Sequence, residues 1–270
     1  MPVALNRGSA EKMFHIGDNV QRGQNIEIGF GAYVEDKTAI SKNVKIGPHT
    51  LILSGSKIRN NTIIGGHCTI GHPTKIGLAK VDFSATSPKI RDLIVKDSST
   101  TIGEGSIIRS GSTIYKNVVI GKKLRTGHNI LVREHTRIGD NCVVGTEAVL
   151  DGYIEIGNKS MVQSHCYIAQ SVRIGSGVFV APGCVFLDNK KIVLGEGLSG
   201  ATVEDYVRIG GGAKILPGIS IGKYALIGAG SVVTRSVMSK AIVYGNPAEV
   251  KGFQKEEEIK RYLDSMKNWQ

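Results

Sequence analysis

Long hydrophobic runs are absent from this chain of 270 residues. No stretch approaches the roughly 18 uninterrupted apolar residues that a membrane-spanning helix requires. Residues 1–15 also lack the apolar segment that characterises a secretory signal peptide. The sequence therefore predicts a cytoplasmic protein with no membrane partner, and its hydrophobic content of 41% suits a soluble core.

Aromatic residues are scarce at 6%, and the chain has no arginine-rich run or basic face studded with aromatic residues. Because nucleic-acid-binding proteins usually carry such features, we expect no nucleic acid partner. Lys and Arg nevertheless outnumber Asp and Glu by 34 to 23, which gives a formal net charge of +11. This excess favours anionic partners such as phosphorylated metabolites.

The dominant feature of the sequence is a repeat of six residues. Hydrophobic residues recur at every sixth position in runs over 16–76, 102–186 and 203–233, interrupted at Arg22 and Thr126. Gly often follows the hydrophobic residue, and a small residue often stands at the fourth following position. This period is typical of a parallel β-helix, in which three short strands form each triangular coil and coils stack about 4.8 Å apart. We expect the aliphatic and small residues to point inward and Gly to supply the turn conformations.

Over residues 16–252 the pattern resembles the left-handed β-helix of the hexapeptide-repeat acyltransferases. The resemblance implies an all-β fold, a left-handed parallel β-helix preceded by a lead-in over 1–15. Two breaks in the period, near 78–101 and 187–202, predict loops. Residues 253–270 have helical spacing of apolar residues, so we expect a short C-terminal α-helix that packs on a face of the β-helix and shields its end.

Three histidines raise the question of a metal site: His49 lies one coil before His67, and His72 follows shortly after. The γ-type carbonic anhydrase has this fold and gathers three histidines around zinc at a subunit boundary. In that family two histidines five residues apart each stand one residue earlier in the hexapeptide repeat than His67 and His72 do here. In addition, His72 falls on a different corner of the prism from His49 and His67. We therefore expect no metal, and we interpret the histidines as solvated or interface turn residues.

All four cysteines occupy the fourth position after the hydrophobic residue of their repeat. They are Cys68, Cys142, Cys166 and Cys184. Because this slot points inward, the sequence predicts buried, unreactive thiols.

The segments GAGSVVT, residues 228–234, and YGNPAEVKG, residues 244–252, resemble the acetyl-CoA-binding end of the acyltransferase family. The resemblance implies acetyl-CoA as co-substrate, with small residues beside its pantetheine arm and cations near its phosphates. The candidate cofactor-binding residues are Ala201, Gly211, Ala213, Lys214, Ala229, Gly230, Arg235, Lys240, Pro247 and Lys251.

Residues 126–169 resemble the central segment of nucleotide-sugar N-acetyltransferases, which acylate an amino group on a nucleotide-linked sugar. Stacking of 18-residue coils places His165 beside Glu147. We expect His165 to act as general base with Glu147 orienting it, and His128 is the rival base. Some relatives have an amide where this chain has His165. The candidate substrate-binding residues are Asn129, Gln163, Asp188 and Asn189.

The predicted function is acetyl-CoA-dependent N-acetylation of a dTDP- or UDP-linked amino-deoxy sugar. The resemblance also implies a homotrimer with its active sites in the clefts between neighbouring subunits. Several alternatives stay open at this point: O-acetyl transfer, an acyl-carrier-protein donor, a serine or antibiotic acceptor, a γ-type carbonic anhydrase-like metalloenzyme, and a non-catalytic scaffold.

Overall fold

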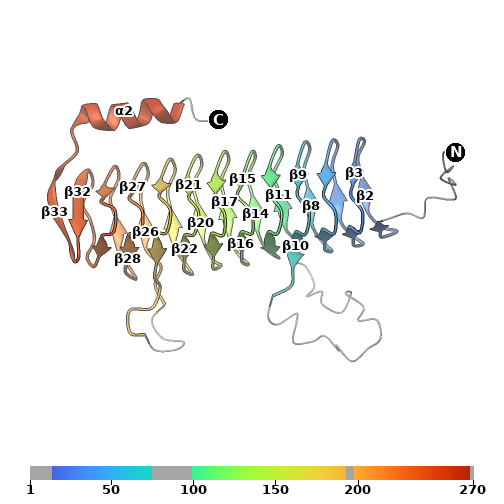
Figure 1. The fold of residues 1–270 in the computed structure, drawn as a ribbon, viewed down its shortest axis with the longest axis horizontal. Coiled ribbons are helices and arrows are strands. Elements are labelled where there is room, and N and C mark those ends of the chain that lie inside the picture. The colour runs from blue at the N-terminus through green and yellow to red at the C-terminus, as the bar shows by residue number, and fades with distance from the viewer. Residues whose placement is uncertain (1–13, 75–98, 193–197, 268–270) are drawn as a thin grey trace, which may run out of the picture.

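The computed structural model describes residues 14–74, 99–192 and 198–267. Its chain winds into a long triangular prism made of short strands, with one helix alongside it (Figure 1). Strands of like position in successive coils pair in parallel and form three sheets. The prediction of a left-handed parallel β-helix is confirmed, and no helix within the described ranges is long and apolar enough to cross a membrane.

Each of the three sheets forms one side of the prism. Sheet A consists of β1 (His15–Ile16), β4 (Tyr33–Val34), β7 (Leu51–Ile52), β10 (Thr69–His72), β13 (Thr113–Tyr115), β16 (Leu131–Val132), β19 (Val149–Leu150), β22 (Tyr167–Ile168), β25 (Val185–Phe186), β28 (Lys214–Ile215) and β31 (Val232–Val233). Sheet B consists of β2 (Gln21–Arg22), β5 (Ala39–Ile40), β8 (Lys57–Ile58), β11 (Thr101–Ile102), β14 (Val119–Ile120), β17 (Arg137–Ile138), β20 (Glu155–Ile156), β23 (Arg173–Ile174), β26 (Thr202–Val203) and β29 (Ser220–Ile221). Sheet C consists of β3 (Glu27–Ile28), β6 (Lys45–Ile46), β9 (Ile63–Ile64), β12 (Ile107–Ile108), β15 (Arg125–Thr126), β18 (Val143–Val144), β21 (Met161–Val162), β24 (Phe179–Val180), β27 (Arg208–Ile209), β30 (Leu226–Ile227), β32 (Ala241–Gly245) and β33 (Ala248–Phe253).

The second residue of nearly every two-residue strand points into the prism. Ile52, Ile114 and Leu150 are fully buried there, and the side chains of successive coils stack into one continuous core. The small fourth-position residues fill the corners of this core, and the four cysteines among them are buried and unpaired. The inward slots predicted from the period are therefore confirmed. At the first coil the inward slot of sheet B holds Arg22, which is exposed.

The glycines after the hydrophobic residue serve a different purpose from the one expected. Gly47 has no left-handed backbone, but a Cβ on it would lie 2.4 Å from the backbone nitrogen of Gly66 in the next coil. Close approach of consecutive coils therefore excludes a side chain at this position. The left-handed conformation falls two residues later, where His49 has φ 54° and Asn61 has φ 57°. Asn, His, Lys and Tyr occupy this third position repeatedly, and the stacked geometry of the coil holds them in it.

The two breaks in the period both leave the prism between a strand of sheet A and the next strand of sheet B. The first break lies between β10 and β11, and β11 pairs with β8 of the preceding coil. Of the loop predicted over 78–101, residues 78–98 lie outside the described residues, and so does Ile76. In the second break Arg173 pairs with Thr202, a separation of 29 residues instead of 18, so this step carries 11 extra residues. Residues 193–197 within it also lie outside the described part.

The prism ends in an antiparallel hairpin. β32 continues sheet C in parallel with β30, and β33 then runs back along it. The helix α2 (Glu256–Lys267) follows and lies along the flank of the last coils (Figure 1). It packs on a face of the β-helix, as the sequence predicts, but it does not cover the end of the prism, where it was also expected. The Tyr262 hydroxyl donates to the Gly177 carbonyl oxygen at 2.8 Å, and the Arg208 guanidinium lies 4.9 Å from the ring centre of Tyr262.

Candidate active site

The turns that lead from sheet C to sheet A form one corner of the prism, which we call the C–A corner. Its turns centre on residues 30–31, 48–49, 66–67, 110–111, 128–129, 146–147, 164–165, 182–183, 211–212 and 229–230. Each turn bonds to the next through its backbone, as where the His165 amide donates to the Thr146 carbonyl oxygen at 2.9 Å. Residues 18 apart on this corner therefore lie one rung apart, at a spacing of about 4.8 Å.

The predicted pair of His165 and Glu147 is brought together on this corner. His165 Nδ1 lies 3.2 Å from Glu147 Oε2, and both side chains are more than half exposed. Both residues hold the left-handed turn conformation, with φ 58° and 56°. The carboxylate can therefore fix the imidazole so that Nε2 points away from it and stays available to a substrate.

His128 lies on the next rung toward the N-terminus and is exposed. Its backbone amide donates to Thr146 Oγ1 at 3.3 Å. A groove of about 340 Å³ opens beside it, lined also by Arg109, Arg125 and Ser164. The groove thus offers two guanidinium groups and an imidazole to an anionic ligand.

Arg109 and Arg125 are not among the site residues predicted from the sequence. One signal was present, because Arg109 stands directly after the inward residue, where most turns of this corner have Gly. Arg125 is the outward residue of β15, and its exposure follows from the repeat alone. Neither observation could show that the two guanidinium groups border one groove.

On the C-terminal side of His165, the next three turns of the C–A corner have glycine at the position that His165 holds in its own turn. These glycines are Gly183, Gly212 and Gly230, all with positive φ. A Cβ at Gly212 or Gly230 would have no neighbour within 4 Å, and one at Gly183 would meet backbone only at 3.9 Å. We call these three residues the glycine shelf. It continues the line of the groove and leaves room for an extended ligand against the backbone.

Of the candidate cofactor residues, Gly211, Ala229 and Gly230 lie on the C–A corner, and Lys214 projects from sheet A close to it. Ala201 and Ala213 are fully buried inside the prism, so their side chains cannot touch a ligand outside it.

The other candidates are dispersed over different sides of the protein. Arg235 follows β31 on the corner between sheets A and B. Lys240 pairs with Glu256 of α2. Pro247 forms the tip of the last hairpin, and Lys251 pairs with Glu249 at 2.9 Å. Within one chain these cations therefore do not form a common phosphate site.

Two of the predicted substrate-binding residues lie near the pair: Asn129 is exposed on the C–A corner, and Gln163 directly follows β21. Asp188 and Asn189 lie on the corner between sheets A and B, so one chain does not bring them to His165. Asn189 Oδ1 accepts hydrogen bonds from the backbone amides of Lys191 and Ile192, at 3.1 and 2.9 Å. This side chain stabilises the turn at the root of the second loop.

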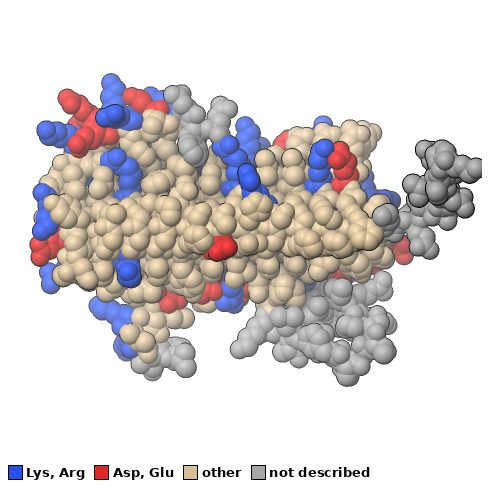
Figure 2. All heavy atoms as spheres, viewed as in Figure 1, with Lys and Arg blue, Asp and Glu red and all other residues tan. Residues whose placement is uncertain are grey.

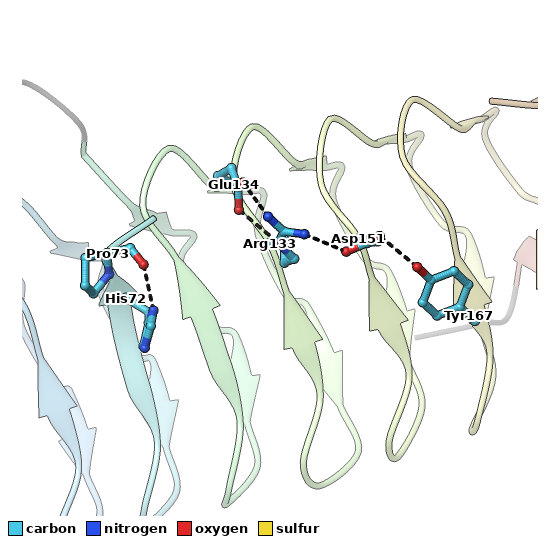
Figure 3. A network of polar contacts seen from close by, with 6 residues as sticks. All are labelled: His72, Pro73, Arg133, Glu134, Asp151 and Tyr167. Atoms are coloured by element: carbon cyan, nitrogen blue, oxygen red, sulfur yellow. Dashed lines mark hydrogen bonds and ion pairs between the residues drawn. The ribbon is translucent and has the colours of Figure 1, made fainter. Parts of the chain in front are cut away.

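The corner between sheets A and B carries a second polar network (Figure 3). The Arg133 guanidinium bonds to Glu134 Oε1 at 2.8 Å and to Asp151 Oδ1 at 2.9 Å, and the Tyr167 hydroxyl donates to Asp151 Oδ2 at 2.7 Å. Burial and the bond to Asp151 raise the pKa of Tyr167 to about 12, so this phenol stays protonated at neutral pH. In the same view His72 Nδ1 lies 2.8 Å from the Pro73 carbonyl oxygen.

The histidines of the suspected metal site are arranged as the repeat predicted. The rings of His49 and His67 stack with their centroids 5.1 Å apart on the C–A corner, whereas His72 lies on the next corner of the prism against Tyr115. Among the described residues no three His, Cys, Asp or Glu side chains are grouped closely enough to hold a metal ion.

Charged residues lie mainly along the edges of the face seen in Figure 2, and a band along the length of the prism is almost free of them.

Together the fold and the site define a β-helix built of hexapeptide repeats, with a polar site on one corner. Residues 200–235 match the hexapeptide repeat of bacterial transferases, and residues 135–170 match the hexapeptide repeat of succinyl-transferase. These two segments of the β-helix thus carry hexapeptide repeats of the kind found in transferases.

Similar proteins include several acetyltransferases. A dTDP-3-amino-3,6-dideoxy-alpha-D-galactopyranose 3-N-acetyltransferase of Aneurinibacillus thermoaerophilus is 45% identical over 58 residues, 22% of this chain and 30% of that protein. A galactoside O-acetyltransferase of Lactococcus lactis is 38% identical over 60 residues, 22% of this chain and 29% of that protein. The part of the chain that aligns thus covers less than a third of the length of either relative.

Among solved structures, a UDP-N-acetylglucosamine acyltransferase of Bacteroides fragilis aligns with a TM-score of 0.58 and 18% identity. The alignment covers 95% of this chain and 83% of that one. At this level of identity the likeness establishes the shared fold.

Proposed function

We propose that the protein is an acetyl-CoA-dependent N-acetyltransferase that acts on the amino group of a dTDP- or UDP-linked amino-deoxy sugar. One observation carries the proposal: the His165–Glu147 pair stands between a groove bordered by arginines and a bare glycine shelf. An acetyltransferase needs this order, because the base must reach the acceptor nitrogen while the thioester approaches from the other side.

The groove supports a nucleotide-linked acceptor. Arg109 and Arg125 can each offer two parallel N–H donors to phosphate oxygens, which is the geometry that diphosphates bind best. His165 then lies about two rungs beyond Arg125, a separation of roughly 10 Å along the prism. The relative from Aneurinibacillus thermoaerophilus is named for such a nucleotide-linked amino sugar.

The glycine shelf supports the donor. A pantetheine arm is long and thin, and its amides need room to lie along a backbone that side chains do not cover. Gly183, Gly212 and Gly230 give that room over three consecutive rungs, and Lys214 projects beside them. The thioester would enter along the shelf and end beside His165.

In the proposed reaction the sugar nitrogen bonds to the thioester carbonyl carbon, and the carbon–sulfur bond breaks. His165 accepts the proton that the nitrogen loses, while Glu147 accepts a hydrogen bond from the Nδ1–H of His165 and orients its ring. CoA leaves as a thiolate and takes up a proton. An amine fits this mechanism because it is a strong nucleophile once neutral, but a sugar hydroxyl would use the same groups.

A homotrimer is part of the proposal, since each chain offers only one side of an open groove. The outward side chains of sheet A from β7 to β25 carry no charge: Leu51, Thr69, Thr113, Leu131, Val149, Tyr167 and Val185. Such an uncharged stripe suits contact with a second copy of the chain. A trimer would also let Asp188 of one chain approach the groove of its neighbour.

The test is thiol release from acetyl-CoA in the presence of a panel of UDP- and dTDP-linked 3-amino and 4-amino sugars. We expect turnover with at least one member and none with the matching hydroxy sugars. Turnover with hydroxy sugars alone, or with an acyl-carrier-protein donor in place of acetyl-CoA, would contradict the proposal. Light scattering of the purified protein checks the trimer.

A further inference from the structure

Thr126 stands where the repeat over residues 102–186 otherwise places a hydrophobic residue. It is buried, and it lines the groove beside His128. The corresponding residues of the coils before and after it are Ile108 and Val144, which are buried in the core of the prism. A buried hydroxyl in such a slot is tolerated only if it is hydrogen-bonded. Its partner therefore indicates what the threonine does there.

The partner of the Thr126 hydroxyl is the backbone of Arg109. The Arg109 amide donates to Thr126 Oγ1 at 2.9 Å. In the next two coils the equivalent amides belong to Gly127 and Gly145, and each donates at 2.7 Å to a backbone carbonyl oxygen of the following coil. The Thr126 side chain thus takes the place that a main-chain carbonyl holds in those turns.

The strand ladder is irregular at the same point. β15 pairs with β18 through two residue pairs, but its register with β12 consists of Ile107 and Arg125. The regular pairing of these two coils thus ends before the turn that begins at Arg109. In sheet B the register of β11 with β14 is reduced in the same way, to Thr101 and Val119. At the C–A corner the Thr126 hydroxyl joins the two coils where the ladder has ended.

The carbonyl group of Arg109 is also held by a side chain. Ser112 Oγ donates to the Arg109 carbonyl oxygen at 2.6 Å, and Ser112 is fully buried. In the turn over residues 145–148 the corresponding bond is made by the backbone, because the Ala148 amide donates to the Gly145 carbonyl oxygen at 3.3 Å. Hydroxyl groups on both sides therefore fix the backbone from which the Arg109 side chain projects.

A side chain at this turn position does not by itself require the hydroxyl contact. Gln163 and Ala181 hold the position of Arg109 in later coils of the same corner. Their amides donate to the carbonyl oxygens of Val180 and Ile209, both at 2.9 Å. The bond to a hydroxyl thus accompanies the turn that carries a guanidinium group of the groove.

We propose that Thr126 is a positioning residue for acceptor binding: its hydroxyl holds the Arg109 turn so that the guanidinium borders the groove opposite the acceptor diphosphate. The inference rests on the proposed function for the identity of this ligand. Two parallel N–H donors bind a phosphate well only in a defined geometry, so a shift of the Arg109 backbone weakens the contact. Thr126 acts through Arg109 and not on the ligand itself.

The test uses variants that exchange the hydroxyl for the groups that other coils place in this slot. Thr126→Val and Thr126→Ile remove the acceptor, and the fold should be retained because valine and isoleucine occupy the slot elsewhere. Thr126→Ser keeps the hydroxyl. The matched control is Thr136→Val on the corner between sheets A and B, since Thr136 is buried and its hydroxyl has no hydrogen-bond partner in the described part of the chain.

Calorimetry measures the binding of inorganic pyrophosphate to the full chain without acetyl-CoA. We expect Arg109→Ala, Thr126→Val and Thr126→Ile each to weaken binding about tenfold, and Thr126→Ser and Thr136→Val to stay within about twofold of the unchanged protein. The double variant Arg109→Ala with Thr126→Val should bind no more weakly than Arg109→Ala alone. Such non-additivity distinguishes a residue that acts through Arg109 from one with a general structural role.

The inference is overturned if Thr126→Val or Thr126→Ile binds pyrophosphate as tightly as the unchanged protein does. Losses that multiply in the double variant also overturn it, as does an unchanged protein that does not bind pyrophosphate. Failure of the proposed function has a different signature. In that case pyrophosphate binds and the variants behave as expected, but no nucleotide-linked amino sugar is acetylated.

Discussion

His165 Nδ1 lies 3.2 Å from Glu147 Oε2, and the two residues hold the same position in consecutive coils. The repeat itself creates this contact, because any two turn residues 18 apart are stacked one rung apart. The Asn43 side-chain amide bonds to Asn61 Oδ1 at 3.0 Å in the same way. The pair therefore requires no special loop, because the turns of the repeat bring the two side chains together.

Replacing His165 tests its role as the base. His165→Asn keeps the left-handed turn and should lower kcat by about 10²- to 10⁴-fold, since general-base assistance is lost. His135→Asn is the matched control, because His135 has φ 58° on another corner and should leave kcat unchanged. Initial rates of thiol release give both values. An unchanged kcat in His165→Asn would remove this residue from the mechanism.

Arg125 should act on the acceptor and not on acetyl-CoA. Arg125→Ala removes one of the two guanidinium groups that border the groove, so the KM of the nucleotide-linked acceptor should rise about tenfold or more. The KM of acetyl-CoA should stay within twofold. Two-substrate steady-state kinetics separate the two constants, and the role of the groove is refuted if only the acetyl-CoA constant moves.

A side chain on the glycine shelf should impair binding of acetyl-CoA and not of the acceptor. Gly230→His places an imidazole in open space at a turn position that histidine adopts elsewhere, so the fold should be retained. We expect the KM of acetyl-CoA to rise at least tenfold with little change for the acceptor. Gly105→His serves as the control, because Gly105 has φ 69° on the corner between sheets B and C. Equal acetyl-CoA kinetics in both variants would place the donor elsewhere.

The attachment of α2 should depend on pH. Burial raises the pKa of Tyr262 to about 12, against an ordinary value of 10.0, although the Arg208 guanidinium lowers it. Because the folded state favours the neutral phenol, this stabilisation is complete below pH 10 and is lost as pH rises through 12. The loss amounts to roughly 3 kcal/mol at most.

Thermal unfolding of the unchanged protein and of Tyr262→Phe, recorded from pH 8 to 12, measures this effect. The advantage of the unchanged protein, which comes from the bond to the Gly177 carbonyl oxygen, should shrink only above about pH 10. A difference that stays constant over the whole range would show that Tyr262 is not buried.

The cysteines should be unreactive in the native protein. All four are buried and free, and burial raises the pKa of Cys142 to about 11. Very little Cys142 thiolate is therefore present at pH 8. The hydrogen bond with the Cys184 thiol lowers the pKa of Cys166, but this side chain is buried like the other three, so reagents cannot reach it. Titration with a disulfide reagent should detect fewer than one thiol per chain before unfolding in guanidinium and all four afterwards. Rapid native labelling of any one of them would contradict the packing.

Much of the fold follows from counting along the sequence. A period of six fixes which side chains point inward, and a coil of 18 predicts that Glu147 and His165 are neighbours. The same count also applies to Ala201 and Ala213, which stand in inward slots and are fully buried. The resemblance implies that they bind the cofactor, but the phase of the repeat directs their side chains inward.

Other features depend on contacts that no period encodes. The flank position of α2 is set by Tyr262 and Arg208 across the last coils. The dispersal of Arg235, Lys240 and Lys251 over separate sides reflects the corner on which each turn falls, together with the reversal in the last hairpin. The break near 187–202 predicts a loop, but only strand pairing shows that it lengthens a single step of the coil by 11 residues.

The reversal between β32 and β33 also limits how such molecules can associate. A further coil would have to join sheet C in parallel, but β33 occupies that edge and runs the opposite way. β33 also exposes the charged side chains of Glu249 and Lys251 along its length. Sheet C therefore ends in an antiparallel strand with exposed charges, which disfavours end-to-end pairing of copies through this sheet.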